Sequence, residues 1–405
     1  MNDKRGRRSA SRPSSRRGTA AALAAALALS LSLAVFGCGS RQKAPFQPAQ
    51  PLDPTRQTIE HVVAERRNAV LNHDRNAFLA TVDGENPTFF VEQGHWFDDA
   101  ARTVDTYTLQ VRNVEQVSAT EARASLQESF QLKDGDRHSF DYEAVYRLRD
   151  GFWKASDYAF EELRQDSVSV RHWDRPRAAQ GALQDELSNL AWLKQTFGWQ
   201  PATDIVIKLY PQQDPFLYSI KPSLPTWVGG WNEFGEAIKY RAPRDTAPPA
   251  DGLLHESTHH MLSELSNDNA SYWLQEGLAT WTPGARAGHF DMAATRSRMG
   301  DRLRWTLPEL EAQDLESMEG PDVGAYYAES FLVVKYLMDT YGVDRFKAVS
   351  AELLKHPANP VTAAEKTSET NQLTRAALEK ALGIPFDRFA ADWYAWAKAQ
   401  VGQAH

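Results

Sequence analysis

Two kinds of hydrophobic spacing organise the first part of the chain. Between Thr58 and Asp83, apolar residues recur every three or four positions, which predicts one long helix. Apolar and polar residues then alternate in four successive stretches, which predicts antiparallel strands. The Asp-Gly pairs at 134–135 and 150–151 separate consecutive stretches and are typical of tight hairpins. The four stretches are DTYTLQVRNVEQV (105–117), ARASLQESFQL (122–132), HSFDYEAVYRLR (138–149) and FWKASDYAFEEL (152–163).

The order of these elements resembles the NTF2-like fold, in which a long helix leads into a curved antiparallel sheet. YRLRDGFWKASDY (146–158) is similar to the last hairpin of that family. The resemblance implies an NTF2-like domain over residues 57–165. An unspecialised β-rich spacer domain is the alternative, because the pattern contains no chemical motif.

A second unit begins with a helix and a short sheet. In RPRAAQGALQDELSNLAWLKQTFGW (175–199), leucines line one side of a helix that is expected to end near Gly198 and Pro201. DIVIKLYP (204–211) and GEAIKYRAP (235–243) alternate like strands. The sequence therefore predicts an α+β chain. Its second domain, over residues 175–400, has a small sheet and a mainly helical C-terminal part.

The N-terminus has the pattern of an export signal. Seven basic residues fall within the first 17 positions, and residues 18–40 carry no charge and are rich in Ala and Leu. VFGCGS (35–40) resembles a bacterial lipobox, which implies cleavage before Cys38 and lipidation of that cysteine. Cys38 is the only cysteine in the chain, so disulfide bonds are excluded. An uncleaved signal anchor is the alternative.

We therefore expect a signal peptide over residues 1–37 and a Pro-rich tether over residues 38–56. The folded part would be held outside the cytoplasm, on a membrane of the cell envelope, through lipidated Cys38. Removing residues 1–37 takes away seven of 45 basic and one of 53 acidic residues, which leaves 38 against 52 and a net charge of −14. An acidic protein without clustered Lys and Arg is not expected to bind nucleic acid.

LLHESTHHML (253–262) carries the main chemical signal. On a helix with about 100° per residue, His259 falls about 40° and Glu256 about 100° from His255. Apolar residues and Thr258 occupy the other side, which predicts a packing face. Two imidazoles one turn apart beside a carboxylate form a His-Glu-x-x-His motif, in which both rings can reach one metal ion. A helix pair with incidental polar residues is the alternative, but burying these groups without a metal is costly.

YWLQEGLATW (272–281) supplies a third ligand. Sixteen residues separate His259 from Glu276, which is enough for a helix end, a turn and the start of a second helix. Two His and one Glu leave the fourth position of a zinc ion open for water. Gly277 is expected to let the two helices approach closely. Thr280, one turn after Glu276, is expected to hydrogen-bond a ligand.

These two motifs, followed by AYYAESFLVVKYLMDTYG (325–342) and ALGIPFDRFAADWYAW (381–396), resemble the gluzincin metallopeptidases, most of all their peptidase MA-like branch. The resemblance covers residues 203–396. It implies that His255, His259 and Glu276 bind zinc. It also implies that Glu256 is the general base, which takes a proton from the attacking water and returns it to the leaving amine.

Three further aromatic side chains lie near these motifs in the sequence: Tyr326, Tyr327 and His260. The family resemblance implies that Tyr327 donates a hydrogen bond to the developing oxyanion, and Tyr326 is the second candidate. His260 falls about 140° from His255 and is interpreted as a packing residue.

The motif with which larger aminopeptidases of this clan grip a substrate amino terminus is absent, which favours an endopeptidase.

The expected function is a membrane-anchored zinc metallopeptidase that acts on peptides or proteins outside the cytoplasm. An extended substrate is expected along the edge of the small sheet, at the strand within 204–211 or the one within 235–243. PTWVGGWNEFG (225–235) is a candidate for shaping the cleft. Two alternatives stay open. One is a binding lipoprotein with a structural or vestigial zinc site, and the other is a zinc amidase acting on a non-protein amide.

Overall fold

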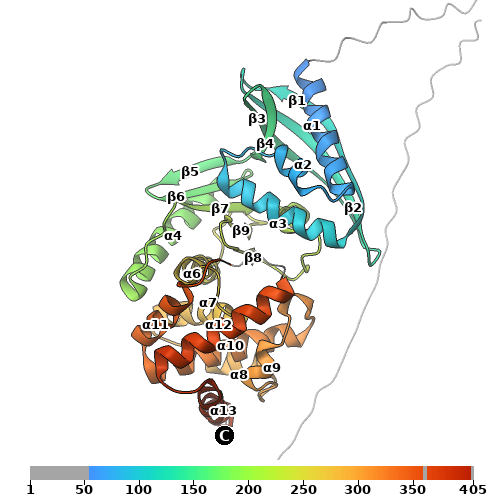
Figure 1. The fold of residues 1–405 in the computed structure, drawn as a ribbon. Coiled ribbons are helices and arrows are strands. Elements are labelled where there is room, and N and C mark those ends of the chain that lie inside the picture. Colours follow the sequence, from blue (N-terminus) through green and yellow to red (C-terminus); the bar gives the residue numbers. More distant parts are fainter. Residues whose placement is uncertain (1–53, 359–362, 403–405) are drawn as a thin grey trace, which may run out of the picture. The chain divides into compact units, whose positions relative to one another are not determined.

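Residues 54–358 and 363–402 are described by a computed structural model of the protein. They contain two modules, each built on its own sheet (Figure 1). The N-terminal module comprises residues 54–158, and the C-terminal module comprises the described residues from 161 onward. The predicted α+β fold class is confirmed. The predicted signal peptide, Cys38 and most of the tether lie outside the described residues.

The N-terminal module begins with three helices where the sequence predicted one. The chain leaves the first helix at His73, whose φ is +54°. Asp74 and Asn86 then cap the next two helices, because each side chain accepts a hydrogen bond from the backbone N three residues later, at 2.9 and 3.4 Å. The helices are α1 (Pro54–Leu71), α2 (Arg75–Ala80) and α3 (Pro87–Thr103).

The four predicted strands of this module are present and pair as an antiparallel meander in the order β1-β2-β3-β4, but the fourth ends at Tyr158 rather than at Leu163. Asp150 and Gly151 both have positive φ, of +50° and +82°, as the tight turn between β3 and β4 requires. The strands are β1 (Val104–Gln116), β2 (Glu121–Leu132), β3 (Arg137–Arg149) and β4 (Phe152–Tyr158).

The sheet of the C-terminal module has the order β5-β6-β7-β9-β8, and β6, β7 and β9 run parallel. β5 falls inside the range 57–165 predicted for the first domain, yet it pairs with β6. The division between the two sheets therefore lies between Tyr158 and Glu161. The strands are β5 (Glu161–Gln165), β6 (Val168–His172), β7 (Ile205–Tyr210), β8 (Gly230–Trp231) and β9 (Ile238–Arg241).

The position of β8 corrects the expectation about the sheet edge. The predicted strands at 204–211 and 235–243 are β7 and β9, and both are interior strands. The edge next to β9 is formed by β8, which consists of two residues only and pairs antiparallel with β9, and β5 forms the opposite edge. A two-residue strand is too short for an alternating pattern to reveal it.

Helices make up the rest of the C-terminal module. The predicted helix at 175–199 is α4, which connects β6 to the parallel strand β7 and ends at Gly198, with φ +75°. Among residues 54–358 and 363–402, none of the helices combines the length and apolar content that crossing a membrane needs. The helices are α4 (Pro176–Phe197), α5 (Gln213–Ile220), α6 (Ala250–Ser266), α7 (Tyr272–Ala287), α8 (Met292–Met299), α9 (Leu307–Glu311), α10 (Pro321–Tyr341), α11 (Val343–Leu353), α12 (Ala363–Leu382) and α13 (Phe386–Gly402).

The second sheet is covered on both faces. Ile205, Ile207 and Leu209 of β7 belong to the core that also contains residues of α4 and α6. The alternate residue Tyr210 belongs instead to the core of the N-terminal module. Lys208 lies on this second face and has no solvent exposure. A polar position that the sequence alone would assign to solvent is therefore buried between the two modules.

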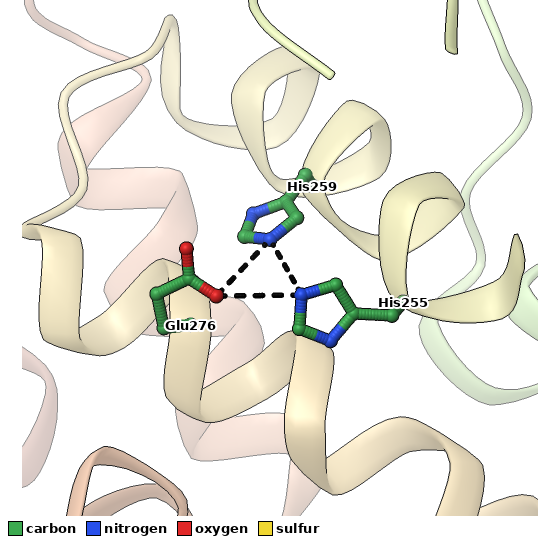
Figure 2. Close-up of side chains that lie close together, drawn as sticks. All are labelled: His255, His259 and Glu276. Carbon is green, nitrogen blue, oxygen red and sulfur yellow. Dashed lines mark hydrogen bonds and ion pairs between the residues drawn. The ribbon is translucent and has the colours of Figure 1, made fainter. Parts of the chain in front are cut away.

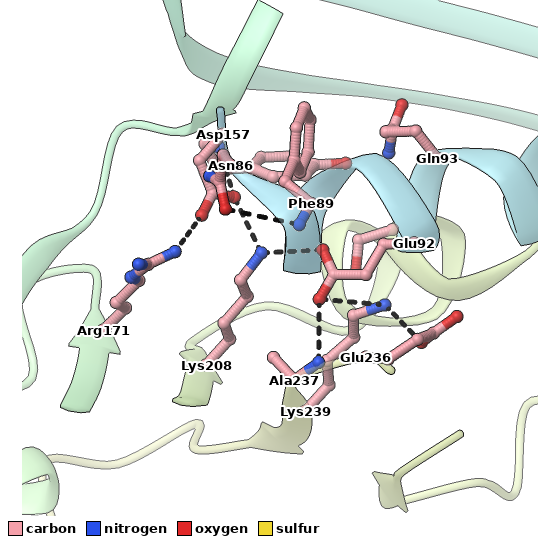
Figure 3. A network of polar contacts seen from close by, with 12 residues as sticks. Asn86, Phe89, Glu92, Gln93, Asp157, Arg171, Lys208, Glu236, Ala237 and Lys239 are labelled. Carbon is pink, nitrogen blue, oxygen red and sulfur yellow. Dashed lines mark hydrogen bonds and ion pairs between the residues drawn. The ribbon is translucent and has the colours of Figure 1, made fainter. Parts of the chain in front are cut away.

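A chain of alternating charges crosses this buried face (Figure 3). Arg171, Lys208 and Lys239 occupy neighbouring positions on β6, β7 and β9. Asp157 of β4 lies between the first two, with its oxygens 2.7 Å from Arg171 and 2.9 Å from Lys208. Glu92 of α3 lies between the two lysines, 2.7 Å from Lys208 and 3.6 Å from Lys239. Carboxylates of the N-terminal module thus neutralise cations of the C-terminal sheet.

Replacing Lys208 with Met should test how much this buried contact contributes to the free energy of unfolding. The substitution leaves the carboxylates of Glu92 and Asp157 buried without their shared cation, so we expect the free energy of unfolding to fall by roughly 3–5 kcal/mol. Lys194→Met, at an exposed lysine of α4, is the matched control and should change it by less than about 0.5 kcal/mol. Denaturant unfolding measures both. Equal losses in the two variants would contradict the prediction.

Candidate metal centre

Helices α6 and α7 carry the predicted motif residues and are joined by a buried turn. α6 ends at Asn267, which has φ +50°, and Asp268 continues the left-handed conformation at φ +58°. The turn is fixed from outside. Asn269 Nδ2 donates to the carbonyl of His356, at 3.1 Å, and Ser271 N donates to the hydroxyl of Thr374, at 2.9 Å. The direction in which the chain returns from α6 to α7 is therefore set by α11, α12 and their connection.

This return brings the three predicted ligands together (Figure 2). His255 Nε2 and His259 Nε2 are 3.1 Å apart. Glu276 Oε2 lies 3.3 Å from the first nitrogen and 3.4 Å from the second. His259 and Glu276 are buried, and His255 is partly exposed. Three possible ligand atoms thus form a nearly equilateral triangle beside a cleft.

The triangle has the dimensions of a zinc site. Tetrahedral zinc with bonds of about 2.0–2.2 Å spaces its ligand atoms about 3.3–3.6 Å apart, and the three observed distances lie at or just below this range. The buried oxygen Oε2 of Glu276 has no aligned hydrogen bond within the part of the chain that the structure describes. A buried carboxylate oxygen without a hydrogen bond is costly, and a cation at the centre would satisfy it. The residues present therefore fit a zinc ion.

The pKa values of the two carboxylates of the site are shifted in opposite directions. Burial alone would raise the pKa of Glu276, but the charges and contacts of His259 and His255 outweigh burial and lower it to about 2. Glu256 is also buried, and burial raises its pKa to about 7, although His255 opposes the shift. Glu276 is therefore suited to remain an anionic ligand, whereas Glu256 is suited to exchange a proton near neutral pH.

Beside the triangle lies a cleft with a volume of about 400 Å³. One wall is the loop that contains β8, and Gly230 faces Glu256 so closely that a Cβ there would lie 2.4 Å from Glu256 Oε1. Gly252 lies one turn before Glu256 on α6, and a Cβ there would lie 2.3 Å from the hydroxyl of Tyr240. Both glycines therefore make room for groups that line the cleft. As the sequence suggested, segment 225–235 contributes to the cleft wall.

The remaining predicted residues fall into different surroundings. Tyr327 lines the cleft, with its ring centroid 6.2 Å from that of His255, whereas Tyr326 is 1% exposed and belongs to the core. Thr280 makes no hydrogen bond to the ligand triangle within the described residues. The hydroxyl contact between α6 and α7 is made instead by Thr258 and Thr282, at 2.8 Å.

His260 packs against Trp199, with ring centroids 6.1 Å apart, and its Nε2 lies 3.5 Å from Glu264. It does not line the cleft.

Gly277 permits a close approach, but the neighbour is not the one expected. Its nearest contacts belong to α10 rather than α6, since a Cβ would lie 2.3 Å from the carbonyl oxygen of Ser330 and 2.7 Å from Val334. α10 thus lies directly against α7 behind Glu276. This packing fixes the depth at which the third ligand sits.

Sequence reasoning missed several residues that line the cleft, among them Tyr240, Tyr272 and Glu316. Tyr272 was quoted only as the start of a motif, and Glu316 lies in a short 3-10 helix without periodicity. The position of Gly252 in the sequence could have indicated a close neighbour, which is Tyr240. A glycine inside a helix, one turn from a chemically active residue, indicates that another group packs closely there.

No protein-family model matches the sequence, and no curated protein matches it. Among solved structures, an NTF2-like protein of unknown function from Shewanella oneidensis is 12% identical, covers 25% of this chain and 99% of its own, and has a TM-score of 0.22. An M1 zinc metallopeptidase from Deinococcus radiodurans is 13% identical, with a TM-score of 0.38. It matches 71% of this chain, which spans only 63% of that protein. With TM-scores below 0.5, neither likeness assigns a family.

Gly277→Ala should separate α7 from α10. Alanine normally stabilises an exposed helix interior relative to glycine, but here the added methyl group meets a backbone carbonyl. We expect a loss of about 1–3 kcal/mol in the free energy of unfolding, as for an overpacked core. Gly84→Ala is the control, because nothing lies within 4 Å of a Cβ at Gly84. A neutral or stabilising effect of Gly277→Ala in denaturant unfolding would contradict this packing.

Proposed function

We propose that this protein is a zinc metallopeptidase that hydrolyses internal peptide bonds. The observation that supports the proposal is the triangle of His255, His259 and Glu276, with the buried carboxylate of Glu256 next to it and an open cleft in front. Two imidazoles and one carboxylate are a common ligand set of catalytic zinc, in which one position remains open. When bound, zinc would polarise the substrate carbonyl and acidify a water molecule.

Glu256 is the proposed general base. Its carboxylate accepts a proton from the attacking water while the water oxygen forms a bond to the carbonyl carbon of the substrate. The same proton then passes from Glu256 to the amide nitrogen as the C–N bond breaks. The elevated pKa of about 7 suits both steps, because the group can take up and release a proton near neutral pH.

Tyr327 is the proposed donor to the oxyanion. Its side chain borders the cleft next to His255. Burial, followed by the negative charges of Glu276 and Glu256, raises the pKa of Tyr327 well above its usual value. The hydroxyl therefore stays protonated and can donate a hydrogen bond to the oxygen on which charge develops.

The edge strand β8 is the proposed docking site for the substrate backbone. β8 pairs with β9 on one side, and its residues line the cleft on the other. An extended peptide added to this edge would pair through its main chain, which tolerates many side chains. Gly230 faces Glu256 directly, so a peptide at this edge would pass close to the general base.

The cellular location is proposed from the sequence pattern. The basic segment, the apolar run and Cys38 favour a lipoprotein anchored outside the cytoplasm, and its peptide or protein substrates would be met there.

Zinc should stabilise the protein through the triangle. Adding zinc to metal-free protein is expected to raise the melting temperature, because a ligand that binds only the folded state stabilises it. His259→Ala removes one of the three proposed ligands and should abolish the rise in melting temperature. His260→Ala, at the adjacent histidine outside the triangle, should retain it. If both variants respond alike in a thermal melt, these three residues are not the zinc ligands.

Glu256→Gln should separate catalysis from metal binding. We expect hydrolysis of casein or a peptide library to fall by about 10²–10⁴-fold, as for loss of a general base. Zinc content measured by elemental analysis should remain near that of the wild type, because Glu256 is not in the triangle. Asp251→Asn, at an exposed acid in the first turn of the same helix, should keep its activity. Undiminished hydrolysis by Glu256→Gln would refute the mechanism.

A further inference from the structure

One face of α3 is directed at the C-terminal module. Glu92, His95, Trp96 and Asp99 follow the spacing i, i+3, i+4 and i+7, so they share one side of the helix. Each of them contacts the C-terminal module. Trp96, for example, donates from its indole nitrogen to the carbonyl of Tyr218 in α5, at 2.9 Å. Glu92, His95 and Asp99 contact residues at the two ends of the segment that carries β8.

The cleft segment, defined as residues 224–235, carries β8 and the tryptophans and glycines that line the cleft. Its N-terminal end is held by Asp99. The two carboxylate oxygens of Asp99 accept hydrogen bonds from the backbone N and the hydroxyl of Ser223, at 3.0 and 2.8 Å. The side chain of Asp99 is only 5% exposed, so water competes little for these bonds.

The C-terminal end of the cleft segment is held by the same face of α3. His95 Nδ1 lies 2.7 Å from Glu236 Oε1, and Glu92 Oε1 accepts a hydrogen bond from Ala237 N, at 3.2 Å. Gly235, with φ +80°, lies against α3 as well, because a Cβ there would be 3.3 Å from Val91. Both ends of the segment are therefore attached to one rigid helix of the other module.

The attachment continues the buried chain of charges (Figure 3). The other oxygen of Glu236 lies 2.9 Å from Lys239, which also approaches Glu92. Glu236 is fully paired, and its side chain is 1% exposed. The hairpin of β8 and β9 is thus held by charges that extend through Glu92 to Lys208 in the middle of the sheet.

A second metal site is a competing interpretation of the same residues. His95, Glu233 and Glu236 lie close enough to share a cation. However, His95 and Lys239 already engage the two oxygens of Glu236, and the ammonium group of Lys239 would repel a metal ion. The contacts are therefore better explained as a fixed attachment between modules.

We propose that Glu92, His95 and Asp99 are positioning residues of the cleft: from one face of α3 they fix both ends of the cleft segment and thereby set the place of the β8 edge. The N-terminal module then supports the cleft segment and is more than a spacer. The effect on turnover rests on the proposed peptidase function. The effect on the order of the cleft segment does not.

The test uses the full chain with Asp99→Ala or His95→Ala. Asp98→Ala is the matched control, because Asp98 is the neighbouring acid on α3 and pairs with Arg75 inside the N-terminal module. Hydrogen exchange should become about tenfold faster in peptides covering 224–241 and stay unchanged elsewhere. For a peptide that the wild type cleaves, KM should rise about fivefold to tenfold, as for the loss of one charge-assisted hydrogen bond, while kcat changes by less than about twofold. Zinc content should stay constant.

The pattern of hydrogen exchange in residues 224–241 decides the proposal. Unchanged exchange in 224–241 in both variants overturns the proposal. A uniform increase over both modules, or a loss of zinc, indicates general destabilisation and also overturns it. If Asp99→Ala does not fold, His95→Ala decides alone, because this side chain is 36% exposed and tolerates truncation. If the wild type cleaves no peptide, the proposed function fails, but the exchange experiment still tests the attachment.

Discussion

The candidate site depends on how α7 packs between α6 and α10. His255 and His259 share one face of α6 as soon as that helix forms, but Glu276 reaches them only because α7 returns at the correct depth. Three contacts set this depth: the hydroxyl pair of Thr258 and Thr282, the anchored turn after α6, and the direct approach of Gly277 to α10. The geometry of the three possible ligands is therefore a property of the helical packing as a whole, rather than of a short motif.

A second constraint operates on the opposite side of the cleft. The sheet of the C-terminal module presents three cations to a face that the N-terminal module covers, and three carboxylates balance them: Asp157 and Glu92 of the N-terminal module and Glu236 beside β9. Buried ion pairs add little net stability compared with apolar packing, but they strongly penalise arrangements in which the partners are separated. These ion pairs consequently fix the position of the two modules relative to each other. The segment that carries β8 is attached to the N-terminal module at both of its ends.

Regular patterns in the sequence identified most of the elements and the three possible ligands. Strict alternation located β1 to β4, and helical spacing placed His255, Glu256 and His259 correctly on one side of α6. α3 was missed because its buried face mixes aromatic residues with acids such as Glu92 and Asp99, which resemble a solvated surface in sequence. The burial of Lys208 and the edge strand β8 were not predicted, for a related reason. Lys208 pairs with Glu92 and Asp157, which lie 116 and 51 positions away, and β8 has only two residues, so neither feature leaves a local pattern.

The burial of the charge chain has a consequence for the conditions under which the protein works. Mobile ions screen exposed charges over about 8 Å at physiological ionic strength, but they do not enter a dry interior. Lys208 and Lys239 have no solvent exposure, so dissolved salt cannot weaken their pairing as it weakens surface ion pairs. If the ionic strength of the surroundings changes, these buried pairs would keep the cleft segment in place under conditions that loosen an exposed electrostatic contact.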